Sequence, residues 1–77
     1  MSAGTRRRLQ GRIILVQEDR FRLLDDSGRG CLFTLSHKSG IDQWDLERLR
    51  DADARVEIEF DGEPNLDSGV AVWVQSA

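Results

Sequence analysis

The sequence predicts a mainly β domain in which five short strands close into a barrel, with one helix between the third and fourth strands. Five segments are rich in β-branched or aromatic residues, and most of them alternate apolar with polar side chains. Between the third and fourth segments the apolar spacing changes to that of a helix. A chain of 77 residues has room for one small domain. Closing its strands into a barrel buries the alternating faces and removes exposed edges.

The first strand is expected over residues 9–17. It contains the apolar run 13–16, which predicts burial on both faces over part of the strand. Gly11 lies inside it, where a glycine often marks a bulge or a sharp bend. Residues 1–8 are small, polar and basic, so we expect a disordered tail ahead of a single domain over residues 9–77.

The second and third strands are expected over residues 20–24 and 29–35. On the second strand Phe21 and Leu23 alternate with arginines, which predicts one core face and one solvent face. The intervening Asp-Asp-Ser-Gly is a strong turn signal, since Asp and Ser bond to nearby backbone and glycine adopts positive φ. The two strands should therefore form a hairpin, with Cys31 on the core side.

The helix is expected over residues 42–51, where apolar residues have helical spacing. Ser39 or Asp42 is suited to cap its first turn. Trp44 lies on this helix, and burial at the end of the barrel is the favoured interpretation. An exposed Trp44 would instead mark a protein contact, because tryptophan is enriched at binding hot spots.

The fourth strand, residues 55–60, shows the cleanest alternation in the chain, and a polar loop over residues 61–69 follows it. The fifth strand is expected over residues 70–74. On it we expect three residues to point inward and two outward, namely Val70, Val72 and Val74 against Ala71 and Trp73. Because every residue there is apolar, the opposite facing stays open.

This order of elements resembles the OB-fold, a five-stranded Greek-key barrel with a helix between its third and fourth strands. The helix at 42–51, the long first strand with Gly11 and the loop at 61–69 carry the resemblance, which is one of architecture. An SH3-like barrel is the main rival, and the helix argues against it. The resemblance implies a binding face centred on strands two and three. Cold-shock proteins, a related family, carry aromatic nucleic-acid motifs there, whereas Phe21 and Phe33 are expected to point inward.

The charge is distributed unevenly along the chain. The net charge is −3, but residues 1–38 contain eight basic and four acidic groups, whereas residues 39–77 contain three basic and ten acidic groups. An acidic chain argues against strong non-specific binding of phosphates, although a local basic face could still bind them.

Arginines on the first three strands, joined by one tryptophan, form the candidate nucleic-acid-binding site. Its members are Arg12, Arg20, Arg22, Arg29 and Trp73. Guanidinium groups hold phosphates bidentately and stack on bases, and an outward tryptophan would add a stacking surface. The alternative is a solvated sheet face in which these arginines pair with Glu18, Asp19 or Glu57.

The sequence offers no convincing catalytic or metal site. A nucleophilic pair of Cys31 and His37 is conceivable, but periodicity places Cys31 in the core, where cysteine behaves as a small hydrophobe. The oxygen-rich loop at 61–69 lacks the glycine and glutamate positions of an EF-hand. We therefore expect no enzyme activity, no metal and no cofactor.

These observations favour a small binding module for single-stranded DNA or RNA, with weak, salt-dependent affinity. The alternative is a protein-interaction or accessory domain with no nucleic-acid role. The longest apolar run, residues 13–16, is too short to span a bilayer, and a single cysteine fits a reducing compartment. We expect a cytoplasmic protein without membrane partners, and a monomer is favoured.

Overall fold

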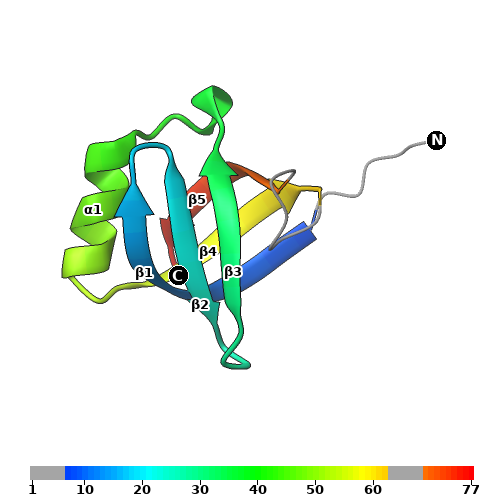
Figure 1. Cartoon of the computed structure of the whole chain (residues 1–77), viewed down its shortest axis with the longest axis vertical. Coiled ribbons are helices and arrows are strands. Elements are labelled where there is room, and N and C mark those ends of the chain that lie inside the picture. The colour runs from blue at the N-terminus through cyan, green and yellow to red at the C-terminus, as the bar shows by residue number, and fades with distance from the viewer. Residues whose placement is uncertain (1–6, 63–68) are drawn as a thin grey trace.

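The computed structural model describes residues 7–62 and 69–77. The strands form a closed barrel in the order β1-β2-β3-β5-β4, and α1 lies between β3 and β4 in the chain (Figure 1). The elements are β1 (Arg7–Gln17), β2 (Arg20–Asp25), β3 (Gly30–Leu35), a 3-10 helix (His37–Ser39), α1 (Gln43–Asp51), β4 (Arg55–Asp61) and β5 (Val70–Ser76). Neighbouring strands are antiparallel except β3 and β5, which are parallel. The predicted closed five-stranded barrel with one helix between strands three and four is confirmed.

β1 begins two residues earlier than the sequence predicts. Arg7 pairs with Phe60 and Arg8 pairs with Glu59, so both arginines belong to the barrel rather than to a tail. Backbone pairing with β4 is accompanied by contacts of the two guanidinium groups with aromatic rings, Arg7 with Phe60 and Arg8 with Trp73. The rest of the expected tail, residues 1–6, lies outside the described residues.

Gly11 lies where β1 changes its hydrogen-bonding partner. Residues 7–12 pair with β4, and residues 11–17 pair with β2. A Cβ atom at this buried position would lie 2.1 Å from the carbonyl oxygen of Leu24 and 2.7 Å from the Cα of Asp25. Glycine therefore allows the β2 backbone to approach at the position where β1 passes from β4 to β2. Figure 1 shows β1 as a long, curved strand.

A β-bulge at Ile14 changes which side chains of β1 reach solvent. Ile13 pairs with Leu23 and Leu15 pairs with Arg22, which leaves Ile14 as the extra residue. Ile14 is 47% exposed and Leu15 is 43% exposed, while Ile13 is buried. The expectation that the apolar run is buried on both faces is wrong, because the bulge turns two consecutive side chains outward.

β2 and β3 form the expected hairpin. Asp25 organises its turn, because one carboxylate oxygen accepts hydrogen bonds from the backbone N–H of Ser27 and Arg29, at 3.0 and 2.8 Å. On the inner face Phe21 stacks on its cross-strand partner Phe33, with ring centroids 5.6 Å apart. This packing fixes the register of the hairpin, and with it the outward direction of the alternate residues.

A capping box starts α1. The Asp42 side chain accepts a hydrogen bond from the Asp45 backbone N–H, and the Asp45 side chain accepts one from the Asp42 backbone N–H. The hydrogen bond from the Asp42 N–H, together with a second one from the Arg48 guanidinium, holds the pKa of the Asp45 carboxyl below its ordinary value. Of the two capping residues left open by the sequence, Asp42 is the one that caps this helix.

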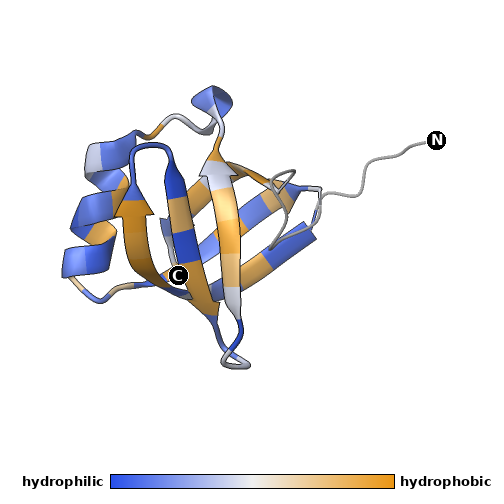
Figure 2. Ribbon diagram, viewed as in Figure 1, coloured by the Kyte–Doolittle hydropathy of each residue, from blue (hydrophilic) through white to orange (hydrophobic). Residues whose placement is uncertain are grey.

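Trp44 points away from the barrel. Leu46 is fully buried, and a residue two positions earlier lies about 200° around the helix. Trp44 is accordingly 67% exposed on a helix that Figure 2 shows to be dominated by hydrophilic residues. The favoured interpretation of Trp44 as core is wrong, because Leu46 occupies the inward position of that turn.

A second bulge, at Val72, sets the facing of β5. Trp73 pairs with Glu59 and Ala71 pairs with Phe60, so Val72 is the extra residue. Ala71 and Val74 are buried, whereas Val70, Val72 and Trp73 are half-buried. The expected inward facing therefore holds for Val74 but not for Val70 and Val72, which are only half-buried. Ala71, expected to face outward, is buried, because the bulge reverses the alternation within the strand.

The inner faces of all five strands and one side of α1 share a single core. Its buried members are Ile13, Val16, Phe21, Leu23, Cys31, Phe33, Leu35, Leu46, Val56, Ile58, Phe60, Ala71 and Val74. Within the described residues, no helix is long and apolar enough to cross a membrane.

Candidate functional site

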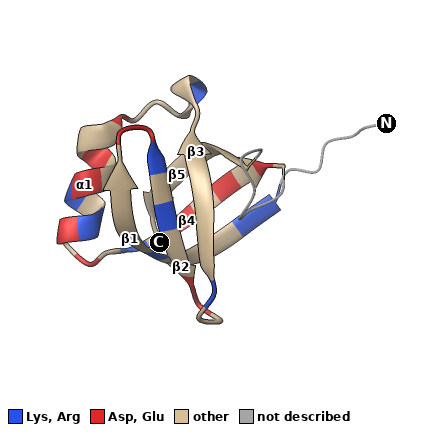
Figure 3. Cartoon of the chain, in the orientation of Figure 1, with Lys and Arg blue, Asp and Glu red and all other residues tan. Residues whose placement is uncertain are grey.

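Arg20 and Arg22 lie together on the outer face of β2. The residue between them, Phe21, is buried in the core, which turns both arginines toward solvent. Figure 3 shows basic segments on β2, and acidic segments on β4 on another part of the barrel. The hairpin thus presents two positively charged side chains, two residues apart on the same face of β2.

The neighbours of these two arginines across the sheet are neutral. Arg20 is flanked by Gln17 on β1 and Thr34 on β3. Arg22 is flanked by Leu15 and Leu32 in the same way. No carboxylate directly opposite either arginine on the neighbouring strands therefore offsets the positive potential of the pair.

Neither guanidinium has a partner in the described part of the chain. No ion pair and no side-chain hydrogen bond there involves Arg20 or Arg22. Glu57, one of the carboxylates considered as a partner, lies on β4 and accepts a hydrogen bond from Gln10 at 3.4 Å. For these two arginines the described residues therefore show no internal neutralisation.

Gly30 leaves space on β3 for the Arg22 side chain. A Cβ atom at this position would lie 3.7 Å from Cδ and 3.8 Å from Nη1 of Arg22. The guanidinium therefore extends across β3 toward the hairpin turn, over a position without a side chain.

A small depression accompanies the arginines. It has a volume of about 140 Å³ and is lined by Leu15, Gln17, Arg20, Phe21, Arg22 and Leu32. Small-molecule pockets typically have roughly 300–1,000 Å³, so this depression is too small to enclose a substrate. The face suits an extended ligand that lies across it.

Arg12 is placed differently from the arginines of β2. It lies at the crossing point of β1, and its Nη1 is 3.6 Å from the Asp53 carboxylate. Its cross-strand neighbour Arg55 pairs with Asp26. Arg12 therefore belongs to a cluster of two cations and two carboxylates, in which its charge is largely balanced.

Arg29 belongs to the turn at the far end of the hairpin. Its backbone N–H donates to Asp25, and the Ser27 hydroxyl donates to the same carboxylate oxygen at 2.7 Å. These hydrogen bonds hold the pKa of the Asp25 carboxyl below its ordinary value, and the bond from the Ser27 hydroxyl contributes more than the bond from the Arg29 N–H. Arg29 thus helps to organise the turn that positions β2 and β3.

Trp73 does not join the arginines of β2. It lies on the outer face of β5 in a cross-strand row with Glu59 of β4 and Arg8 of β1. The Arg8 guanidinium carbon is 5.9 Å from the centre of the Trp73 ring system, within the range of a cation–π contact. Of the five predicted site residues, the structure places Arg20 and Arg22 side by side and Trp73 on a different face.

Cys31 and His37 form no catalytic pair. Cys31 is 1% exposed, and burial raises the pKa of its thiol, which disfavours the reactive thiolate. His37 is exposed on the 3-10 helix. The structural interpretation of Cys31 is confirmed. Within residues 7–62 and 69–77, no three His, Cys, Asp or Glu side chains are grouped so that they could hold a metal ion. Most of the acidic loop, residues 63–68, lies outside the described residues.

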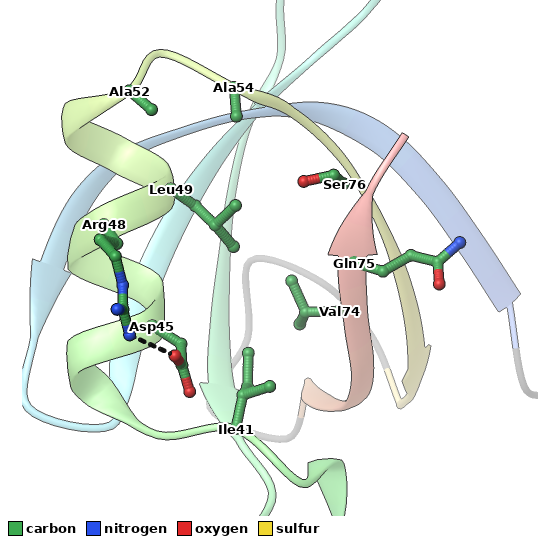
Figure 4. Close-up of a pocket in the computed structure, with 9 residues that line it drawn as sticks. All are labelled: Ile41, Asp45, Arg48, Leu49, Ala52, Ala54, Val74, Gln75 and Ser76. Atoms are coloured by element: carbon green, nitrogen blue, oxygen red, sulfur yellow. Dashed lines mark hydrogen bonds and ion pairs between the residues drawn. The ribbon is translucent and has the colours of Figure 1, made fainter.

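Sequence reasoning missed a groove between α1 and β5. It has a volume of about 440 Å³, and Ile41, Leu49 and Val74 point into it (Figure 4). The charged residues on its helix side, Asp45 and Arg48, are paired with each other at 2.7 Å. The groove is therefore suited to apolar contacts rather than to an anion.

Comparison with known proteins does not identify a family. No protein-family model, curated protein or solved structure matches this chain. The functional argument therefore depends on the geometry of the site.

Proposed function

We propose that this protein belongs to the OB-fold class of small barrels and is a non-enzymatic module that binds single-stranded nucleic acid on the outer face of β2 and β3. The observation that carries the proposal is the pair Arg20 and Arg22, which is exposed, without a partner in the described residues and flanked across the sheet by neutral side chains. In OB-fold proteins this part of the barrel is the ligand-binding face.

The rest of the charge distribution sets the strength of the interaction. The chain has a net charge of −3, and Glu18 and Asp19 lie in the loop next to Arg20. Repulsion of phosphates by these carboxylates weakens the long-range attraction. We therefore expect micromolar or weaker affinity that falls as salt is added.

Fluorescence anisotropy with labelled oligothymidylate and oligouridylate at low salt tests the proposal. The double variant Arg20→Gln/Arg22→Gln should bind at least about tenfold more weakly, since a hydrogen bond to a charged group contributes about 1.5–3 kcal/mol. The matched control, Lys38→Gln/Arg48→Gln, removes the same charge from exposed positions on the 3-10 helix and α1. Equal losses in the two double variants would refute the proposed site, because only the overall charge would then matter.

The loop carboxylates provide a test with the opposite sign. Glu18 lies next to the face, is exposed and makes no ion pair in the described part of the chain. Glu18→Gln should therefore strengthen oligonucleotide binding at low salt. Weaker binding by this variant would contradict the placement of the ligand beside Arg20.

A protein-interaction module is the second candidate function, and the exposure of Trp44 favours it. A tryptophan that is 67% exposed suits the centre of a protein contact. Sedimentation of the wild type and of Trp44→Ala distinguishes self-association from a monomeric state. A concentration-dependent dimer that is lost in the variant would support this candidate. If the wild-type protein remained monomeric at high concentration, self-association through Trp44 would be refuted.

A further inference from the structure

The proposed face exposes no aromatic ring to a ligand. The chain has five aromatic residues, three phenylalanines and two tryptophans, and all are among the described residues. The phenylalanines are at most 2% exposed and pack in the core, where the Phe33 and Phe60 centroids are 5.0 Å apart. Trp44 is on the outward side of α1, and Trp73 is in the row with Glu59 and Arg8. Base stacking on aromatic rings, the usual device of single-strand binding, has no residue to perform it here.

The face instead offers groups that match a sugar–phosphate backbone. Arg20 and Arg22 are two residues apart on one strand, which places their Cα atoms about 7 Å apart on the same side of the sheet. Each guanidinium fits a phosphate bidentately. Gln17 and Thr34 add neutral hydrogen-bonding groups beside Arg20, and Leu15 and Leu32 add apolar surface beside Arg22.

We infer that the ligand is bound through two neighbouring phosphodiesters, with the leucines in contact with its sugars, and that the bases contribute little. This inference rests on the proposed function and specifies the chemistry of the same site. Binding is then independent of base sequence. For two phosphates on a single strand, the slope of log K against log salt concentration should be about −1.4.

Three labelled dodecamers separate the contributions of backbone and base in anisotropy titrations. The first is oligothymidylate, the second is the same deoxyribose–phosphate chain without bases, and the third is oligothymidylate with uncharged methylphosphonate linkages. We expect the abasic strand to bind almost as tightly as oligothymidylate. The methylphosphonate strand should lose at least about tenfold in affinity, because its linkages carry no charge.

The outcomes distinguish the inference from the proposed function. Stacking of even one base contributes about tenfold or more in affinity. A loss of about tenfold or more for the abasic strand, with oligothymidylate still bound at the arginines, would overturn the backbone mode and leave the proposed function standing. Failure of oligothymidylate itself to bind would overturn both. A smaller loss for the abasic strand, together with a salt slope near −1.4, supports the inference.

Discussion

Replacement of Gly11 by alanine would place a methyl group 2.1 Å from the Leu24 carbonyl oxygen and 2.7 Å from the Asp25 Cα. Both atoms belong to the backbone of β2, so no side-chain rotation can relieve the overlap. Ordinary contact begins at 3.4 Å, and the β2 backbone would have to move by more than about 1 Å. Gly11 pairs with both Asp25 and Val56, so the movement would disturb the two ladders that meet there.

The expected cost is large for a domain of this size. Overpacking with backbone shifts costs about 1–3 kcal/mol, and we expect the upper end here, about 3 kcal/mol, because pairing is disturbed as well. In a domain of this length each kcal/mol lowers the melting temperature by about 4–8 °C, which gives a fall of about 12–24 °C. Thermal unfolding followed by circular dichroism and urea unfolding both measure this loss.

Gly30→Ala is the matched control. Gly30 also lies in a strand, but a Cβ atom there would meet only the flexible Arg22 side chain, at 3.7 Å or more. Its effect should stay within about 0.5 kcal/mol, as for most surface substitutions. If Gly11→Ala and Gly30→Ala proved equally stable, close approach of β2 would not be the reason for glycine at position 11.

Two further changes test the core and the turn. Leu46→Ala should cost about 2–5 kcal/mol by urea unfolding, because this helix residue is fully buried. Leu15→Ala, at a position that is 43% exposed, should cost much less, and equal costs would contradict the outward placement of Leu15. Asp25 has a folded-state pKa below its ordinary value, so its stabilising effect is present above the ordinary pKa of 3.8 and is lost as the pH falls through the folded value. The stability difference between wild type and Asp25→Asn should therefore shrink as the pH falls below about 4, and a difference that is constant with pH would contradict the hydrogen-bonded carboxylate.

Alternation and turn chemistry made the strands and the hairpin predictable from sequence. Phe21 and Leu23 face inward as their period of two requires, and the Asp25 turn forms as its composition indicates. The two bulges could not be predicted in the same way. Ile14 and Val72 lie in runs where every neighbour is apolar, so no change of polarity marks the extra residue.

The candidate site was predictable in part. The outward direction of Arg20 and Arg22 follows from the burial of Phe21 and Leu23 on the same strand. The pairing of Arg12 with Asp53 depends on the passage of β1 from β4 to β2 at Gly11, and the separation of Trp73 from β2 depends on the closure of the barrel and its strand order. Such contacts join residues far apart in the sequence, and local patterns carry no information about them.

A ¹⁵N–¹H NMR titration with a short single-stranded oligonucleotide at low salt tests the central claim most directly, because it locates binding residue by residue. Amide shifts concentrated at Arg20, Arg22, Leu32 and Thr34, with α1 unchanged, are the predicted result. An unchanged spectrum, or shifts confined to the groove between α1 and β5, would contradict the claim that the outer face of β2 and β3 is the binding surface.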